Sequence, residues 1–199
     1  MIDEELDYDH HQLKNLHDQS FDILNSCQKK AYEAIVRSVQ SQKGELFFIH
    51  GHGGIEKTFL WNTIIAKFRS EVEIVLPVAT SRIATLLLPN GRTTHSRFHI
   101  PINVTTESTC EIRHGTTLVE LLMRTSLIIW DEAPMAHKFC FEALDKHLRD
   151  IFTTRFPNSN EKPFGGLTVV CGGDFRQFLP VPKGTKGDII DASLSSSYL

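Results

Sequence analysis

The segment GHGGIEKTFL, Gly51 to Leu60, carries the first residues that could do chemistry. A glycine-rich turn before a helix can wrap backbone N–H groups around a phosphate, and the helix N-terminus adds positive potential. Lys57 would then reach the β- and γ-phosphates, and the Thr58 hydroxyl would bind Mg²⁺. The turn itself would contribute backbone N–H groups from Gly51, Gly53 and Gly54. Glu56 stands where the pattern G-x-x-x-x-G-K-[ST] requires glycine, so an unrelated glycine turn explains this segment alone about as well.

Two acids follow a later apolar run, in SLIIWDEA. Asp131 could hold Mg²⁺, usually through water, opposite the Thr58 hydroxyl. Glu132 could polarise the water that attacks the γ-phosphate. A strand end that happens to carry two acids is common. The lysine-threonine pair and this acidic pair, in that order and each after a predicted strand, are much less expected by chance.

A third polar segment, GGDFRQFLPV, runs from Gly172 to Val181 and follows another apolar run. Asp174 and Gln177 could lie beside the γ-phosphate, and Gln177 could respond to its presence. A glycine turn with polar neighbours is an equally good explanation of this segment taken alone.

The elements that would position these residues alternate along the chain. Short apolar runs, typical of fully buried strands, occur in ELFFIHG, EIVLPVA, SLIIWDEA and LTVVCGGD. Segments with helical spacing of apolar residues are LNSCQKKAYEAIVRSV, KTFLWNTIIAKF, SRIATLLL and KFCFEALDKHLRDIF. Asn25 or Ser26 can cap the first helix. This alternation predicts an α/β fold with a parallel sheet and helices on both faces, and ligands of such sheets bind at the carboxyl ends of the strands.

Two regions lack this pattern. Residues 1–22 are polar and histidine-rich, and we interpret them as a flanking linker or a loosely held helix. Residues 89–117, with Pro89, Gly91 and Pro101, are predicted to form a surface excursion. The predicted organisation is therefore a flank, 1–22, followed by one domain, 23–199.

Composition excludes several classes of protein. The 199 residues are 41% hydrophobic and 23% charged, with a formal net charge of −3, so any DNA-binding surface must be a local patch. Arg82, Arg92 and Arg97 supply such a local charge. The four scattered cysteines form no C-x-x-C pair, the N-terminus is acidic rather than signal-like, and no apolar run approaches the ~20 residues of a membrane span. We expect an intracellular protein without membrane association.

Taken together, the motifs resemble the first RecA-like motor domain of Pif1-like helicases of superfamily 1, especially the plant forms related to Helitron transposons. GHGG-xx-KTFLWNTI resembles Walker A, WDEAPMAHKFCFEALD resembles Walker B, and GGDFRQFLPV resembles motif III. LNSCQKKAYEAI resembles the motif that holds adenine, with Gln28 as the matching glutamine. VATSRIATLLLPNGRTTHSRFHIPI resembles the motif Ia region. The resemblance covers roughly residues 20–199.

This resemblance implies a P-loop NTPase that uses ATP and Mg²⁺ to move 5′ to 3′ along single-stranded DNA and to unwind it. It implies catalytic roles for Lys57, Asp131, Glu132 and Gln177, and a nuclear protein of DNA repair, recombination or telomere maintenance. Hydroxyl groups bind phosphates and an aromatic ring can stack on a base. The implied DNA contacts are Thr80, Ser81, Thr94, His95, Ser96 and Phe98. Phe98 could equally be a core residue.

The chain departs from the family at three points. Ile55 and Glu56 replace the usual Thr-Gly, and a like charge 4 Å from a phosphate costs about 4 kcal/mol at an effective dielectric of ~20. Arg82 replaces a usual glycine. No second RecA-like domain, with its arginine fingers, follows Leu199 in this sequence. The alternative to a helicase motor domain is a catalytically inactive remnant that binds DNA weakly at most. A P-loop kinase or GTPase is disfavoured, because Gln28 and motif III have no role in either.

Overall fold

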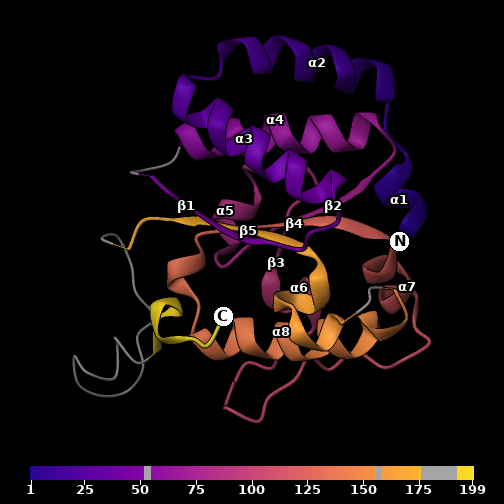
Figure 1. Cartoon of the computed structure of the whole chain (residues 1–199), viewed down its shortest axis with the longest axis vertical. Helices are drawn as coiled ribbons and strands as arrows, with labels where there is room; N and C mark the ends of the chain where they lie inside the picture. Colours follow the sequence, from indigo (N-terminus) through magenta and orange to yellow (C-terminus); the bar gives the residue numbers. More distant parts are fainter. Residues whose placement is uncertain (52–54, 156–157, 176–191) are drawn as a thin grey trace.

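The computed structural model describes residues 1–51, 55–155, 158–175 and 192–199 (Figure 1). The helices are α1 (Ile2–Leu6), α2 (His10–Ile23), α3 (Ser26–Gln40), α4 (Ile55–Ser70), α5 (Arg82–Thr85), α6 (Thr94–Phe98), α7 (Thr117–Arg124) and α8 (Lys138–Ile151). The strands are β1 (Leu46–His50), β2 (Ile74–Ala79), β3 (Arg92–Thr93), β4 (Thr125–Asp131) and β5 (Thr168–Gly173). A short 3₁₀ turn, η1 (Ala133–Met135), follows β4.

The strands form one sheet in the order β1-β5-β4-β2-β3, and every pair is parallel. The four predicted strands are all present, which confirms the predicted parallel α/β sheet. Because the strands are parallel, their carboxyl ends meet at one edge of the sheet. That edge therefore collects the three polar segments identified in the sequence.

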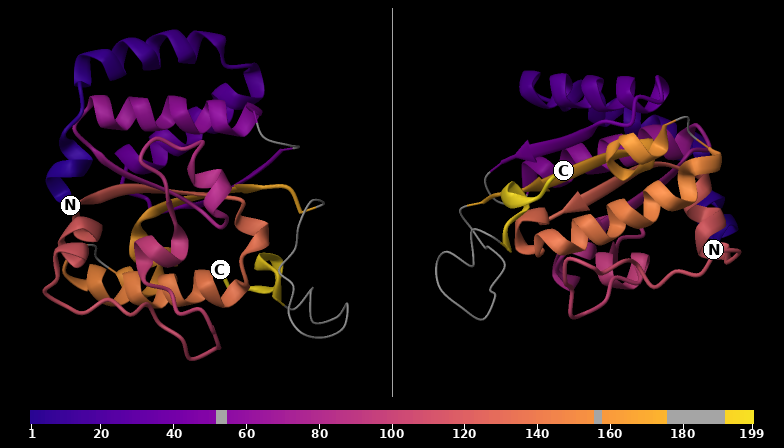
Figure 2. Two further views of the ribbon diagram at one scale, coloured as in Figure 1. Left: turned by 180° about the vertical axis from the view of Figure 1, so that it is seen from behind. Right: turned by 60° about the horizontal axis from the view of Figure 1, so that its bottom comes forward.

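Helices cover both faces of this sheet. Along β4, Leu127 and Ile129 pack into one core with α3 and α4, whereas Ile128 and Trp130 pack into the other with α7 and α8. The views agree on this layering: α3 and α4 lie on one side of the sheet and α8 on the other (Figures 1 and 2). Both cores are apolar and fully buried, so the sheet that carries the site is held rigidly from two sides.

The start of α3 follows from local hydrogen bonding. The Asn25 side chain accepts a hydrogen bond from the Gln28 backbone N–H, and the Gln28 side chain accepts one from the Asn25 N–H, each at 2.9 Å. This reciprocal pair is a capping box, which satisfies backbone donors at the end of a helix. The expected cap at Asn25 is confirmed.

The segment 82–117 differs from its prediction. The expected helix SRIATLLL stops after Thr85, because Pro89 disfavours helical backbone before it and the chain turns instead. The predicted surface excursion contains β3 and α6, and its side chains Phe98 and Ile100 are buried in the α8-side core. Apolar residues in an irregular segment can complete a core without the periodicity that a sequence pattern detects.

Residues 1–22 form packed helices where we expected a linker or a loosely held helix. On α1, Glu5 is 2% exposed and its carboxylate lies 2.8 Å from Arg97 Nη2 and 3.4 Å from Arg69 Nη2. The Arg69 guanidinium also lies 4.4 Å from the centre of the Tyr8 ring. Helix α2 lies along α4, on the side away from the sheet (Figure 2). A buried charge is tolerable only when it is paired, and here the partners are 64 and 92 residues away in sequence.

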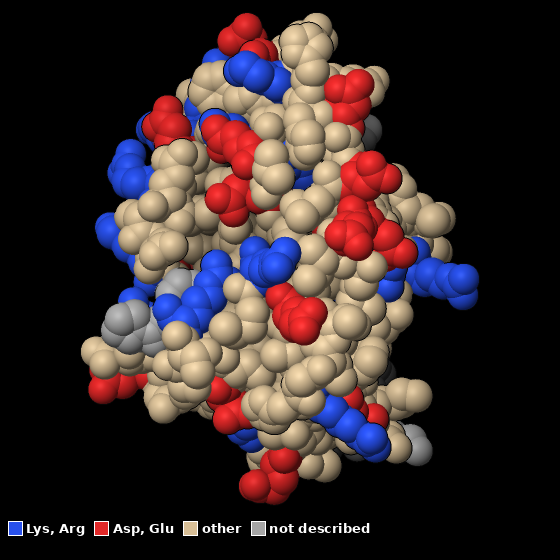
Figure 3. Space-filling model, turned by 90° about the vertical axis from the view of Figure 1, so that its right-hand side faces the viewer, with Lys and Arg blue, Asp and Glu red and all other residues tan. Residues whose placement is uncertain are grey.

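The face that carries the N-terminus shows basic and acidic side chains spread among each other (Figure 3). A surface that binds a nucleic-acid backbone concentrates positive charge. This face is therefore a poor candidate for contact with DNA.

The buried Glu5 cluster makes a testable prediction. Glu5→Ala leaves two arginines buried without their shared carboxylate, so it should lower the free energy of unfolding by about 3 kcal/mol. Glu4→Ala, one residue earlier, removes a side chain that is 67% exposed and should change it by less than about 0.5 kcal/mol. Chemical denaturation followed by circular dichroism measures both. Equal effects of the two substitutions would contradict the packing of α1.

Candidate functional site

One cavity lies at the carboxyl edge of the sheet and gathers residues from α4, β4 and the end of β5. The predicted site residues that line it are Lys57, Thr58, Asp131, Glu132 and Asp174. Thr58 and Lys57 come from the first turn of α4, and the acids follow adjacent strands. The structure thus brings together five residues that stand up to 117 positions apart in sequence, since 174 − 57 = 117. Gly53, Gly54 and Gln177, which we also assigned to this site, lie outside the described residues.

Lys57 is the cation of this cavity. Its side chain is 8% exposed, and its ammonium group donates a 2.6 Å hydrogen bond to the backbone carbonyl of Gly51. A Cβ at Gly51 would come within 3.3 Å of the lysine stem, so glycine allows the close approach. The lysine is therefore held across the base of the loop that precedes α4. The ammonium group has three N–H donors, so it can bind a phosphate oxygen in addition to this carbonyl or in place of it.

Asp131 is buried beside this lysine, with 6% of its surface exposed. Its Oδ1 atom has no hydrogen bond of standard geometry among the described residues, although the Trp61 indole N–H, which also lacks one, lies close enough to favour the ionised carboxyl. Burial raises the pKa of the Asp131 carboxyl, and this effect outweighs the Glu132 backbone N–H, the Trp61 indole and the charge of Lys57. An unpartnered carboxylate oxygen beside a threonine hydroxyl is a donor set suited to Mg²⁺, which prefers oxygen ligands and keeps several waters.

Two glycines bring β5 close to this acid, and we did not assign them from the sequence. A Cβ at Gly172 would lie 2.4 Å from the Trp61 ring and 3.3 Å from Asp131 Oδ1. A Cβ at Gly173 would lie 2.2 Å from the Pro134 ring. The Gly-Gly-Asp sequence therefore serves as a packing surface for Trp61 and for η1, as well as a turn. Trp61 is fully buried and packs behind the lining of the cavity, against Gly172.

A second cavity lies next to the first, on the α3 side. Gln28, Gly51 and Glu56 are among its lining residues, together with Lys57, which borders both cavities. The Gln28 side-chain N–H donates to the backbone carbonyl of Glu56 at 3.0 Å, which ties the start of α3 to the start of α4. The Glu56 side chain is exposed and does not line the cavity that holds Thr58 and Asp131. Glu56 therefore borders the cavity on the Gln28 side and is absent from the lining of the cavity that holds Thr58 and Asp131.

The end of β2 is hydrogen-bonded to the acidic end of β4. The Ser81 hydroxyl donates to Glu132 Oε2 at 2.5 Å. Ser81 Oγ also accepts from the Ala84 N–H, as the N-cap of α5. The Thr80 hydroxyl accepts from the Trp130 indole N–H at 3.0 Å. Both hydroxyl groups were assigned to DNA from the sequence, and both contact Walker B side chains here.

The remaining DNA candidates separate into two groups. Thr94 and Phe98 are completely buried, so neither can touch a DNA strand, and Phe98 is a core residue rather than a stacking one. Their assignment as DNA contacts is wrong, because the segment that bears them folds into the α8-side core. Ser96 is exposed and His95 is half-buried. Burial lowers the pKa of His95, so at neutral pH it is uncharged and can offer a hydrogen bond but no positive charge.

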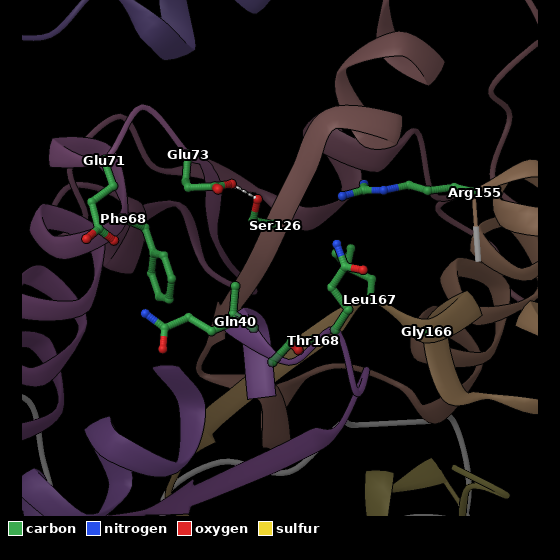
Figure 4. A pocket seen from close by; sticks show the side chains of 11 residues that line it. Gln40, Phe68, Glu71, Glu73, Ser126, Arg155, Gly166, Leu167 and Thr168 are labelled. Carbon is green, nitrogen blue, oxygen red and sulfur yellow. Dashed lines mark hydrogen bonds between the residues drawn. The ribbon is translucent and has the colours of Figure 1, made fainter. Parts of the chain in front are cut away.

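A further cavity lies at the opposite edge of the sheet, where strands begin (Figure 4). Three of its polar side chains are engaged with one another or with backbone. Ser126 donates to Glu73, and Arg155 donates to the carbonyls of Met123 and Thr125. None of the assigned site residues lines it. Among the described residues, no helix is both long and apolar enough to cross a membrane.

The fold and the carboxyl-edge cavity define a P-loop nucleotide-binding domain of the RecA type. A family model described as PIF1-like helicase matches residues 23–199, so the chain belongs to the PIF1-like helicase family. This confirms the family and the fold class inferred from the motifs. Among curated relatives, "ATP-dependent DNA helicase Pif1" of a Psychrobacter species is 31% identical over 73% of this chain. "ATP-dependent DNA helicase PIF1" of Emericella nidulans is 29% identical over 79%.

Solved structures give the same result. Pif1 of a Bacteroides species in complex with ADP-AlF4 matches 88% of this chain and 39% of its own, with 26% identity and a TM-score of 0.68. Bacteroides Pif1 bound to ssDNA matches 85% of this chain and 36% of its own, with 28% identity and a TM-score of 0.66. The chain spans about a fifth of the length of the two curated relatives, 21% and 20%.

The burial of Asp131 leads to a prediction about stability and its dependence on pH. Because burial raises its pKa, the ionised carboxylate costs folding free energy at neutral pH. The Asp131→Asn variant should therefore have a free energy of unfolding about 1 kcal/mol higher than that of the unmodified chain at pH 7, and it should unfold at a higher denaturant concentration. The gain should shrink as the pH falls and vanish near the unfolded-state pKa of about 4, where both states bind the proton. Chemical denaturation at several pH values between 4 and 7 measures the free energy of unfolding of both proteins.

A second buried aspartate gives the matched control. Asp145 is fully buried, and its oxygens accept from the Phe164 N–H, Arg149 Nε and the Tyr198 hydroxyl at 2.6, 2.7 and 2.8 Å. Asp145→Asn should lower the free energy of unfolding by about 2 kcal/mol, because it loses charge-assisted bonds. If both substitutions destabilised the protein equally, Asp131 would be a structural acid.

Proposed function

We propose that this chain is the nucleotide-binding motor domain of a Pif1-like DNA helicase, and that the carboxyl-edge cavity binds ATP and Mg²⁺. The observation that carries the proposal is the assembly of Lys57, Thr58 and Asp131 in one cavity, with a buried Asp131 oxygen that lacks a partner. Within such a domain, hydrolysis of ATP drives movement along single-stranded DNA. The names of the relatives support this activity for the family.

Each residue then has a role that its position supports. Lys57 would bind the β- and γ-phosphates, and Thr58 with Asp131 would hold Mg²⁺, Asp131 through water. The ion, when bound, neutralises charge that builds up on the transferred phosphoryl group. Glu132 would accept a hydrogen bond from the attacking water. Gln28 would receive adenine in the neighbouring cavity, where Ala31 and Leu60 add apolar lining. Asp174 lines the phosphate cavity, and Gln177 remains a proposal by resemblance.

The charge of Glu56 would affect the affinity for nucleotide. Glu56 is exposed and borders the cavity proposed for the base and sugar, so we infer that its charge would act on the phosphates through solvent rather than in direct contact. Solvent screening weakens such repulsion well below the buried-pair value. A weakened site therefore agrees better with the geometry than an occluded one.

A catalytically inactive remnant is the second candidate, and one contact favours it. Lys57 is held by the Gly51 carbonyl at 2.6 Å, and glycine is missing before the lysine. Such a remnant would keep the fold and bind DNA weakly at most. Binding of nucleotide by the unmodified chain separates the two candidates.

The proposed substrate strand passes over the carboxyl edge of the sheet, near Thr80, Ser81, His95 and Ser96. A strand direction of 5′ to 3′, a nuclear location, and roles in DNA repair, recombination or telomere maintenance belong to the proposal as the family resemblance implies them.

Nucleotide binding is the direct test of this proposal. A fluorescent ATP analogue titrated with Mg²⁺ should bind the unmodified chain in the micromolar range, and Lys57→Ala should weaken binding by at least about tenfold. Ile55→Thr combined with Glu56→Gly should tighten binding by about tenfold, because glycine admits the phosphate to the backbone. Binding that Mg²⁺ does not strengthen would contradict the assignment of Asp131.

Charge and backbone effects separate with two further variants. Glu56→Gln removes the charge but keeps the side chain, so it should recover only the screened electrostatic part, about twofold. Glu33→Gln removes an equal charge from an exposed position on α3 and should leave affinity unchanged. If the unmodified chain and the Thr-Gly variant both fail to bind, the inactive remnant is correct.

A further inference from the structure

Two neighbouring hydroxyl groups at the end of β2 form hydrogen bonds with the end of β4, one as an acceptor and the other as a donor. Thr80 accepts a hydrogen bond from the Trp130 indole, which leaves its own hydroxyl proton available. Ser81 donates its proton to Glu132 Oε2 at 2.5 Å. A serine hydroxyl carries a single proton, so Ser81 can donate to one acceptor at a time.

A DNA phosphate oxygen is an acceptor, so it needs a donor. Thr80 could serve a phosphate without giving up its contact with Trp130. Ser81 could serve one only by releasing Glu132. The lone pairs of Ser81 Oγ are also in use, since they cap α5 by accepting from the Ala84 N–H at 3.2 Å. The cap holds the serine in place, so only the direction of its O–H bond can change from one acceptor to another.

We propose that Ser81 is a positioning residue whose hydroxyl switches its hydrogen bond between Glu132 and a phosphate of the bound strand, while the proton stays on Ser81 Oγ. Without DNA, the bond directs the Glu132 carboxylate toward β2. When a strand phosphate accepts the Ser81 hydrogen bond instead, Glu132 regains its full capacity to accept a hydrogen bond from water in the nucleotide cavity. The inference rests on the proposed function, and it names how the strand would control the same site.

The backbone around Glu132 is fixed, so a change in the Ser81 hydrogen bond would affect only the Glu132 side chain. Its φ of 52° places the residue in the left-handed region, at the turn from β4 into η1. The peptide groups on both sides are fixed, because Thr80 N–H donates to the Asp131 carbonyl and Met135 N–H to that of Glu132. Only the Glu132 side chain is left to reorient. Loss of the Ser81 bond would therefore alter the carboxylate without altering the strand.

The test is a double-mutant cycle on DNA affinity. A fluorescently labelled oligothymidine is titrated at low salt with the unmodified chain, Glu132→Ala, Ser81→Gly and the double variant, and anisotropy is recorded. With Ser81 present, Glu132→Ala should tighten binding by about fivefold, because the hydroxyl no longer has to leave a charged acceptor. In the Ser81→Gly background the same substitution should tighten binding by less than about twofold, which is the effect of removing one negative charge.

Glycine is chosen because it remains a good N-cap, so α5 keeps its start; circular dichroism checks the fold of each variant. Ser81→Thr keeps a hydroxyl at the cap and should restore the fivefold response, which a purely structural role for Ser81 would not require. Equal tightening in both backgrounds overturns the exchange. Absence of oligothymidine binding by all the variants overturns it as well, whereas the nucleotide site is judged separately by its own titration.

Discussion

The position of β4 between β5 and β2 is the constraint on which the rest of the site depends. All three strands are parallel, so their carboxyl ends are neighbours. The acids that end β4 therefore meet Asp174 from β5 on one side and Ser81 from β2 on the other. The nucleotide cavity and the proposed strand contacts share one pair of residues, Asp131 and Glu132. No long conformational pathway is needed to connect them.

This arrangement has a thermodynamic cost that the surrounding fold offsets. A buried carboxylate oxygen without a partner is unfavourable, and Asp131 has one. Asp145, whose oxygens accept three hydrogen bonds, contrasts with Asp131, and this contrast supports the proposed role of Asp131 in binding a ligand. The two apolar cores supply the compensation. Local polar strain at a site of this kind is expected where the scaffold is rigid.

The sequence predicted the features that depend on local pattern. The apolar runs gave four strands, and the order of Lys57, Asp131 and Asp174 gave the edge where they meet. It could not predict that Glu5 is buried, because its partners lie 64 and 92 residues away and a lone acid in a polar segment has no periodicity. Phe98 was left open between core and surface, since an irregular segment does not reveal which way it faces. The bond from Ser81 to Glu132 joins residues 51 apart, and only strand order brings them together.

Helix α1 has a consequence for the solubility of the domain. Strand β3 pairs with β2 only at Val78 and Ala79, so the N-terminal part of β2 has no strand neighbour on that side within the described chain. There α1 contacts β2, and Arg69, which Glu5 holds, reaches the Val75 carbonyl at 3.5 Å. Unpaired sheet edges recruit strands from other molecules. A polypeptide that began at residue 23, where the family model begins, would expose this edge and be prone to self-association.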